Sequence, residues 1–337
     1  ARPFGVNITK VMLNFLPPRP SSGARFIPTQ RPPPATPLFS RRDRREKTRE
    51  PGGRENPLDN RNINKYKVFN ELKKYFYTHN TMKIFPMISI ALINQKGGVG
   101  KTTSAVNIGA GLAQLGKKVL LIDLDPQAHL TYALGLSAHS LPKTVYELLK
   151  GEASVSDILQ KRGNLHLLPS SLNLSGADIE LAGVAGREYL LKEALQEVKG
   201  YHVLLIDCPP SLGLLTLNAL TTARAVYIPV QTEFFALQGM SKLLETVQLV
   251  QKRLNKHLEL MGIIGTLYDE RKNLNREVVG KIRKTFGAKL FRTLIRDNVA
   301  LAEAPSHGQT IFEYQPASHG ATDYLQLCGE MIRRHHL

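Results

Sequence analysis

The chain has 337 residues, 42% of them hydrophobic, and a formal net charge of +17. This length and apolar content are sufficient for a substantial core, which excludes a fibrous or wholly disordered protein. The two cysteines, Cys208 and Cys328, have neither the spacing of a disulfide framework nor that of a metal site, so we expect two small buried residues in a reducing compartment. No apolar run approaches the roughly 18 residues needed to cross a bilayer, so no stable membrane insertion is expected.

Most of the basic charge lies in the N-terminal quarter. Residues 1–86 carry 18 Lys and Arg against 6 Asp and Glu, and they hold 12 of the 20 prolines. Such a segment has too little periodic apolar surface to offset the entropy lost on ordering, so 1–60 is expected to be disordered. Three interpretations of 1–86 stay open: an arm that binds nucleic acid, a targeting peptide, or a stretch outside a working protein that starts at Met87.

After Pro86 the sequence alternates between strand-like and helix-like blocks. The run ISIALIN is apolar and rich in β-branched residues, and comparable buried runs follow at 118–123, 165–169, 202–207, 225–230 and 260–267. Helical spacing of apolar residues continues to Leu115 after the first run and recurs over 240–254. Strands buried on both faces that alternate with helices predict an α/β fold with a doubly wound, mostly parallel sheet.

The first predicted strand leads into NQKGGVGKTT, Asn94 to Thr103. A strand that ends in a glycine-rich turn and opens a helix places backbone N–H groups and the positive end of the helix dipole around an anion. Lys101 would reach the β- and γ-phosphates, and the Thr102 hydroxyl would bind Mg²⁺. An ordinary strand-to-helix turn is the alternative, which G-K-T-T in this context disfavours. The predicted ATP-binding residues of the loop are Gly97, Gly98, Val99, Gly100, Lys101, Thr102 and Thr103.

Two later strands, in LLIDLDPQ and LLIDCPPS, end in an acidic residue. Open α/β sheets bind ligands at the carboxyl ends of their strands, so Asp123, Asp125 and Asp207 are expected to converge on the phosphates. Asp207 fits the acidic residue that holds the hydration shell of Mg²⁺. A single carboxylate at a strand end is more often a cap, but three beside one phosphate loop favour function. The predicted metal-site residues are Thr102, Asp123 and Asp207.

Five motifs identify a resemblance that covers 87–337. KGGVGKTT, DLDPQ, IDCPPSLG, EAPSHG and SHGATDYLQL occur in the order typical of the ParA (Soj) family of partition ATPases, within the deviant Walker A superfamily. The resemblance implies a P-loop ATPase domain over 87–337 with ATP and Mg²⁺ as ligands. Short members of the family begin a few residues before the first strand, which supports Met87 as the working start. The extension 1–86 has no counterpart in this resemblance.

The same resemblance implies roles for individual residues. Lys96, the extra lysine of the loop, would contact the phosphates bound by the other subunit of a face-to-face homodimer. Asp125 is similar to the switch residue that positions or activates the attacking water, so Lys96, Lys101 and Asp125 are the predicted catalytic residues. The CPPS stretch from 208 to 211 corresponds to the second switch loop. Asn298 is the predicted contact of the adenine base.

The resemblance further implies that the ATP-bound dimer binds double-stranded DNA without sequence preference. A ParB-like centromere-binding partner would stimulate hydrolysis, and the protein would be cytoplasmic and nucleoid-associated. Clustered cations would neutralise phosphates. For any one of these lysines a normally charged helix face is the better explanation, whereas the group as a whole favours DNA contact. Ala300 stands where a basic residue is frequent in the family, which predicts weaker DNA binding unless its neighbours compensate. The candidates for DNA contact are Arg271, Lys272, Arg276, Lys281, Arg283, Lys284, Lys289, Arg292 and Arg296.

Other classes of protein share the phosphate loop. A MinD-like membrane-cycling ATPase relies on a basic amphipathic C-terminal helix, whereas DYLQLCGEMIRRHHL is expected to pack as the last helix. A nitrogenase-iron-protein-like reductase needs paired cysteines, and Cys208 and Cys328 do not provide them. No motif supports a small-molecule ligase related to dethiobiotin synthetase. An orphan ParA-like ATPase that positions a protein cluster shares every motif and stays open.

Overall fold

The computed structural model describes residues 87–233 and 236–337, so the predictions for 1–86 lie outside the described residues. In the described part, seven strands form one sheet in the order β3-β4-β2-β5-β1-β6-β7. All neighbouring strands are parallel except β3, which runs antiparallel to β4. The predicted doubly wound, mostly parallel α/β fold is confirmed. The strands are β1 (Ile88–Leu92), β2 (Val119–Asp123), β3 (Gln160–Arg162), β4 (Leu165–Leu168), β5 (Val203–Asp207), β6 (Ala225–Gln231) and β7 (Glu259–Thr266).

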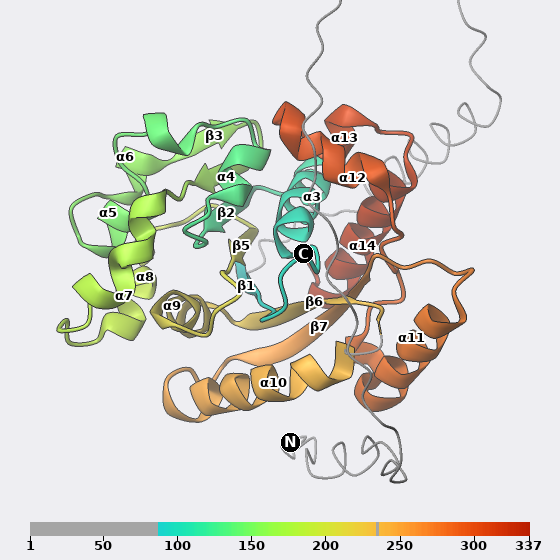
Figure 1. Cartoon of the computed structure of the whole chain (residues 1–337). Helices are drawn as coiled ribbons and strands as arrows, with labels where there is room; N and C mark the ends of the chain where they lie inside the picture. Colours follow the sequence, from blue (N-terminus) through green and yellow to red (C-terminus); the bar gives the residue numbers. More distant parts are fainter. Residues whose placement is uncertain (1–86, 234–235) are drawn as a thin grey trace, which may run out of the picture. The chain divides into compact units, whose positions relative to one another are not determined.

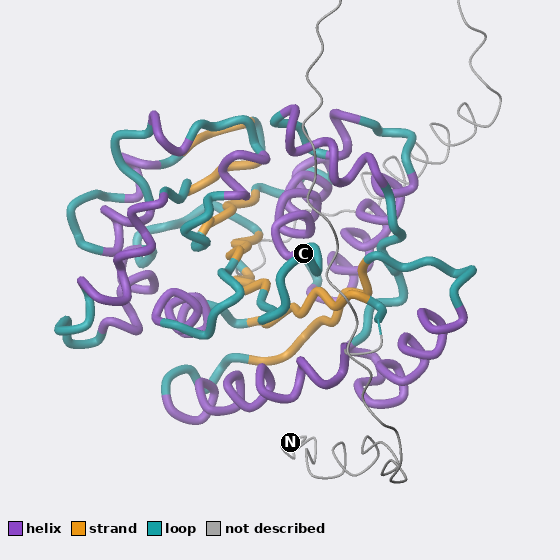
Figure 2. The backbone as a smooth tube through the Cα atoms, in the orientation of Figure 1, coloured by secondary structure: helices purple, strands orange, loops and turns teal. Residues whose placement is uncertain are grey.

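Helices cover both faces of this sheet, as Figures 1 and 2 show. The α-helices are α3 (Lys101–Gln114), α4 (His129–Ala133), α5 (Val145–Leu149), α6 (Val155–Ile158), α7 (Ala177–Glu180), α8 (Leu190–Ala194), α9 (Leu214–Thr222), α10 (Ala236–Arg253), α11 (Asn273–Phe286), α12 (Val299–Glu303), α13 (Ile311–Tyr314) and α14 (His319–His335). Short 3₁₀ turns occupy η1 (Ala138–Ser140), η2 (Leu172–Gly176), η3 (Arg187–Tyr189), η4 (Gly287–Lys289) and η5 (Ala304–His307).

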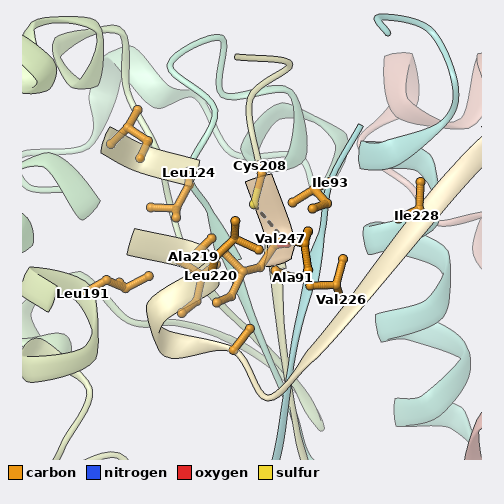
Figure 3. Packing of buried hydrophobic residues seen from close by; sticks show 14 of the residues in the cluster. Ala91, Ile93, Leu124, Leu191, Cys208, Ala219, Leu220, Val226, Ile228 and Val247 are labelled. Carbon is orange, nitrogen blue, oxygen red and sulfur yellow. Dashed lines mark hydrogen bonds between the residues drawn. The ribbon is translucent and has the colours of Figure 1, made fainter. Parts of the chain in front are cut away.

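Successive residues of the central strands enter two different cores. Ile90 and Leu92 of β1 belong to a first core, which also contains residues of α3, α12, α13 and α14. Ala91 and Ile93 belong to a second core, packed by α5 to α11, and part of it is drawn in Figure 3. Because side chains alternate between the faces of a strand, this arrangement buries both faces. It explains the continuous apolar runs in the sequence.

The C-terminal helix α14 packs against α3 in the first core (Figure 1). Gly111 on α3 makes the close approach possible, because a Cβ there would lie 2.7 Å from Sγ of Cys328. Cys328 is fully buried and its thiol donates to the carbonyl oxygen of Ile108 at 3.4 Å. Both predictions are confirmed: α14 packs as the last helix, and Cys328 is a small buried residue, as is Cys208. Among the described helices none is long and apolar enough to cross a membrane.

The strand β3 was not predicted from the sequence. Its residues Gln160, Lys161 and Arg162 are polar, and none of them is buried. Only the antiparallel pairing with β4, in which Lys161 lies opposite His166, makes this segment a strand. Its position at the edge of the sheet accounts for its charged composition, since charged edge strands resist pairing with other chains.

The strand order determines which segments meet at the carboxyl edge of the sheet. Strand β5 lies between β2 and β1, and its last residue, Asp207, stands in register with Asp123 on one side and Leu92 on the other. The loop that follows β1 therefore begins beside two carboxylates from other strands. This edge is the expected ligand site of an open parallel sheet.

Candidate nucleotide site

The glycine-rich loop connects β1 to α3 and is fastened to two neighbouring strands. Gly98 and Gly100 have positive φ values of 73° and 82°, a backbone region that favours glycine. Asn94 Nδ2 donates to the carbonyl oxygen of Pro229 in β6 at 2.7 Å, and Thr266 Oγ1, at the end of β7, donates to that of Val99 at 2.9 Å. The loop is thus shaped by its glycines and held from both ends. It curls at the N-terminus of α3, where N–H groups favour an anion.

Lys101 lies inside this curl. Lys101 is only 8% exposed. Its Nζ donates to the carbonyl oxygen of Lys96, five residues earlier in the loop, at 3.4 Å. The partner is neutral, so the ammonium charge stays available for a phosphate. A buried lysine at the junction of a glycine-rich loop and a helix N-terminus is the arrangement that a P-loop uses for the β- and γ-phosphates.

Asp207 and Thr102 form the second part of the site. Thr102 Oγ1 donates to Asp207 Oδ2 at 2.6 Å, while Oδ1 of this fully buried carboxylate has no hydrogen-bond partner within the described residues. Burial, reinforced by the negative charge of Asp123, raises the pKa of Asp207 to about 8. A buried oxygen without a donor beside a P-loop hydroxyl fits hydrated Mg²⁺, whose charge would favour the ionised carboxylate.

The carboxylate of Asp123 organises the loop after β2. Its Oδ2 accepts hydrogen bonds from the backbone N–H (2.9 Å) and the hydroxyl (2.7 Å) of Thr131, and its Oδ1 accepts from the backbone N–H of Asp125 (3.1 Å). Complete burial raises the pKa of Asp123 to about 7 despite these bonds. Because both oxygens are engaged within the chain, Asp207 is better placed than Asp123 to hold a metal. A metal role for Asp123 stays a prediction.

Asp125 occupies the turn that Asp123 shapes. Its Oδ1 accepts from the backbone N–H of Gln127 at 3.0 Å, and its carbonyl oxygen accepts from the hydroxyl of Ser170, which follows β4, at 2.7 Å. Ser170 also donates its backbone N–H to Thr131 Oγ1 at 3.0 Å. Thr131 and Ser170 were not predicted as site residues, because neither stands in a motif. The parallel pairing of β2 with β4 brings Ser170 to the same edge.

Lys96 lies at the exposed rim of the loop. Its ammonium bonds to Oε1 of Gln231 at 2.8 Å and to Oε2 of Glu233 at 3.0 Å, and its side chain is 51% exposed. Gln231 ends β6 and Glu233 follows it, so both partners belong to the same subunit. The sequence carried no local signal for these partners.

Asn298 is placed near the carboxyl edge but performs a structural task. Its side-chain oxygen accepts from the backbone N–H of Ala300 at 2.9 Å and so caps α12. The preceding residue, Asp297, donates its N–H to the carbonyl oxygen of Tyr268, just beyond the end of β7. Asn298 therefore follows a segment that runs alongside the end of β7. The adenine contact stays a prediction.

Several of the predicted DNA-contact residues take part in contacts within the fold. Arg296 forms an ion pair with Asp323 (2.5 Å) and Arg271 forms one with Asp269 (2.9 Å). Arg276 donates to the carbonyl oxygen of Glu270 and to Asn273, and Lys289 donates to that of Leu260. Arg292 also has a contact within the fold, because its backbone N–H donates to the carboxylate of Glu330. Five of the candidates are exposed to solvent on the surface of the fold: Lys272, Lys281, Arg283, Lys284 and Arg292.

The two arginines among these five residues line the same cavity. Arg283 and Arg292 line a cavity of about 660 Å³ together with Arg333, Arg334 and Glu330. Arg283 comes from α11 and Arg292 follows η4, whereas the other three residues come from α14. The fold thereby gathers basic residues from separate segments on one face.

Comparison with known proteins identifies the family. A family model described as an AAA domain matches residues 87–260. The chain is 50% identical over 245 residues to the sporulation initiation inhibitor protein Soj of Bacillus subtilis strain 168. This alignment covers 72% of the chain and 97% of Soj. It is 43% identical over 258 residues to the chromosome partitioning protein ParA of Caulobacter vibrioides, and this alignment covers 75% of the chain and 97% of ParA. The chain belongs to the ParA/Soj family of ATPases.

A solved structure agrees with this assignment of fold and ligand. The fold matches the crystal structure of cobyrinic acid a,c-diamide synthase from Mycobacterium smegmatis with bound ADP and magnesium, with a TM-score of 0.66. The two sequences are 38% identical, and the match covers 74% of this chain and 95% of the synthase. The predicted P-loop fold is confirmed. As a member of the ParA/Soj family, the chain is an ATP hydrolase that works with ATP and Mg²⁺, and Lys101, Thr102 and Asp207 form a site that fits them.

Proposed function

We propose that the chain is a DNA-segregation ATPase that alternates between a monomer with ADP or no nucleotide and an ATP-bound sandwich dimer on DNA. The observation that carries this proposal is the opposite placement of two lysines on one loop. Lys101 is buried within the loop, suited to its own nucleotide, whereas Lys96 is half exposed at the rim, suited to a nucleotide in another subunit. The partitioning names of the most similar relatives support the cellular role.

In the proposed reaction the loop and Lys101 bind the β- and γ-phosphates of ATP. Thr102 and Asp207 hold Mg²⁺, which supplies positive charge to the phosphate oxygens when bound. Asp125 positions the water that attacks the γ-phosphate, and the hydrogen bonds of Asp123 and Ser170 keep Asp125 in place. The loop glycines hold the backbone N–H groups toward the phosphates.

Lys96 completes the site in the dimer. Two nucleotides near a two-fold interface concentrate negative charge, and a lysine supplied by the other subunit offsets it in the manner of an arginine finger. Dimerisation would then depend on ATP, because the phosphates of each nucleotide attract the Lys96 ammonium of the partner. Asn298, at the carboxyl edge, would contact the adenine base.

The dimer is proposed to bind double-stranded DNA through the exposed cations of α11 and its neighbours. Lys272, Lys281, Arg283, Lys284 and Arg292 are exposed and would contact phosphates. The guanidinium groups of Arg296 and Arg271 are held by Asp323 and Asp269, so these two residues would contribute less. A ParB-like partner would stimulate hydrolysis and so release the DNA. A protein with this cycle would work in the cytoplasm, on the nucleoid.

The test measures DNA binding by the full chain carrying Asp125→Ala, which should bind ATP without hydrolysing it. Duplex DNA is titrated with ATP, ADP or no nucleotide across a salt series. Binding with ATP alone that weakens steeply as salt rises is expected, since phosphate contacts release counterions. Equal binding without nucleotide would contradict an ATP-gated clamp and would direct attention to the basic residues 1–86.

A positioning ATPase that acts on a protein cluster or a membrane is the second candidate. It shares the two-lysine loop, and an ATP-dependent dimer that does not bind DNA would favour it. For the membrane variant, the apolar face of α14 is already buried against α3, with Tyr324, Leu325 and Cys328 fully or almost fully enclosed. This packing favours DNA or a protein cluster over a membrane.

A further inference from the structure

Lys96 is held by the end of strand β6 in its own subunit. Besides the two bonds from its ammonium to Gln231 and Glu233, Gln231 Nε2 donates to Glu233 Oε1 at 2.6 Å. The three side chains thus contact one another in a closed set, here named the Lys96 latch. The main chain of Lys96 is anchored separately, since its N–H donates to Asn94 Oδ1 at 3.0 Å. The side chain can therefore leave the latch without a change in the loop.

The latch is exposed and consequently easy to open. The side chains of Lys96 and Glu233 are each 51% exposed, and exposed ion pairs are weak and screened by salt. The phosphates of a nucleotide carry more negative charge than one carboxylate. A nucleotide presented by a second subunit would therefore compete with Glu233 for the same ammonium.

We propose that Glu233 is a positioning residue that holds Lys96 on its own subunit and thereby opposes ATP-dependent dimerisation. This inference rests on the proposed action of Lys96 on the nucleotide of the partner. Formation of the dimer exchanges the carboxylate of Glu233 for phosphates, so the affinity of the dimer depends on the difference between the two interactions. ADP lacks the γ-phosphate, which makes the exchange less favourable and leaves the latch closed.

The test measures the dimer dissociation constant of the full chain by analytical ultracentrifugation, with a non-hydrolysable ATP analogue and Mg²⁺. Glu233→Gln retains the shape of the side chain and removes its charge. It is expected to tighten the dimer by about two- to fivefold at low salt, the range of an exposed ion pair, and by less at high salt. Glu245→Gln, an exposed position on α10 outside the latch, is the matched control and should leave the constant unchanged.

An unchanged or weaker dimer for Glu233→Gln at low salt overturns the proposal. Lys96→Ala separates this failure from failure of the proposed function. If Lys96→Ala abolishes the dimer while Glu233→Gln has no effect, the role of Lys96 in trans stands and the latch is wrong. If Lys96→Ala dimerises normally, both are wrong. The decrease of the Glu233→Gln effect at high salt separates a charge effect on Lys96 from a purely structural contribution of Glu233, which salt would not screen.

Discussion

The centre and the rim of the nucleotide site place similar charged groups in opposite environments. At the centre, Lys101, Asp123 and Asp207 are at most 8% exposed. At the rim, Lys96 and Glu233 are each 51% exposed and contact each other directly. Burial strengthens electrostatic interactions and shifts pKa values, whereas exposure leaves an ion pair weak and movable. The same loop therefore combines a rigid binding centre with a rim that is free to change partners.

The largest expected effect comes from removing the central charge. Lys101→Ala should weaken ATP binding by about a hundredfold, because a phosphate loses a charge-assisted hydrogen bond in a buried setting. Isothermal titration calorimetry with ATP and Mg²⁺ measures this loss. Lys96→Ala is the control from the same loop and should retain ATP affinity as a monomer. Similar affinities for the two variants would abolish the distinction between centre and rim.

The buried carboxylates predict how stability depends on pH. The pKa of Asp123 is raised to about 7 and that of Asp207 to about 8, so the folded state binds protons that the unfolded state has released. Proton binding by these two carboxyl groups stabilises the folded state, and this stabilisation is lost as the pH rises from about 4 to 8. Without nucleotide, urea unfolding should show a decrease of more than about 1.4 kcal/mol between pH 6 and pH 9, the value of one pKa unit.

Asp207→Asn sharpens this prediction, because an amide has no charge to lose. Its free energy of unfolding should depend less on pH, and Mg²⁺ with ATP should no longer restore stability at pH 9. The wild-type chain should gain most from Mg²⁺ and ATP at high pH, where the carboxylates are ionised. An equally steep decrease in Asp207→Asn would show that other groups cause it.

A smaller effect is expected at Thr131, which links the two strand-end loops. Thr131→Val removes the donor to Asp123 and the acceptor for Ser170, so it should cost about 1–3 kcal/mol of unfolding free energy and slow ATP hydrolysis by displacing Asp125. Urea unfolding and a steady-state ATPase assay measure the two effects. Thr246→Val on α10, whose hydroxyl donates only to the carbonyl oxygen of Lys242, is the matched control. Unaltered hydrolysis with reduced stability would limit Thr131 to a structural role.

The smallest effect on stability is expected at the rim. Lys96→Ala removes one exposed ion pair, which contributes at most about 1 kcal/mol. Urea unfolding should therefore be nearly unchanged, while size-exclusion chromatography with ATP should show loss of the dimer. A large decrease in stability would mean that the rim is as rigid as the centre.

The sequence by itself determined most of the sheet and the centre of the site. Runs buried on both faces need no partner to be recognised, so β1, β2 and β4 to β7 match predicted segments closely. The loop around Lys101 could also be predicted from the sequence, because its glycines and lysine form a motif of contiguous residues. The strand β3 was missed, since its polar residues become a strand only through pairing with β4.

Only the tertiary structure decided which side chains surround the loop. Ser170 reaches Asp125, and Glu233 reaches Lys96, because parallel strands align their carboxyl ends irrespective of their separation along the chain. Thr131, Ser170 and Glu233 stand in no motif, and each would pass as an ordinary loop residue. The periodicity of a sequence records burial, which is local to each strand or helix, whereas partners at a sheet edge depend on strand order and register.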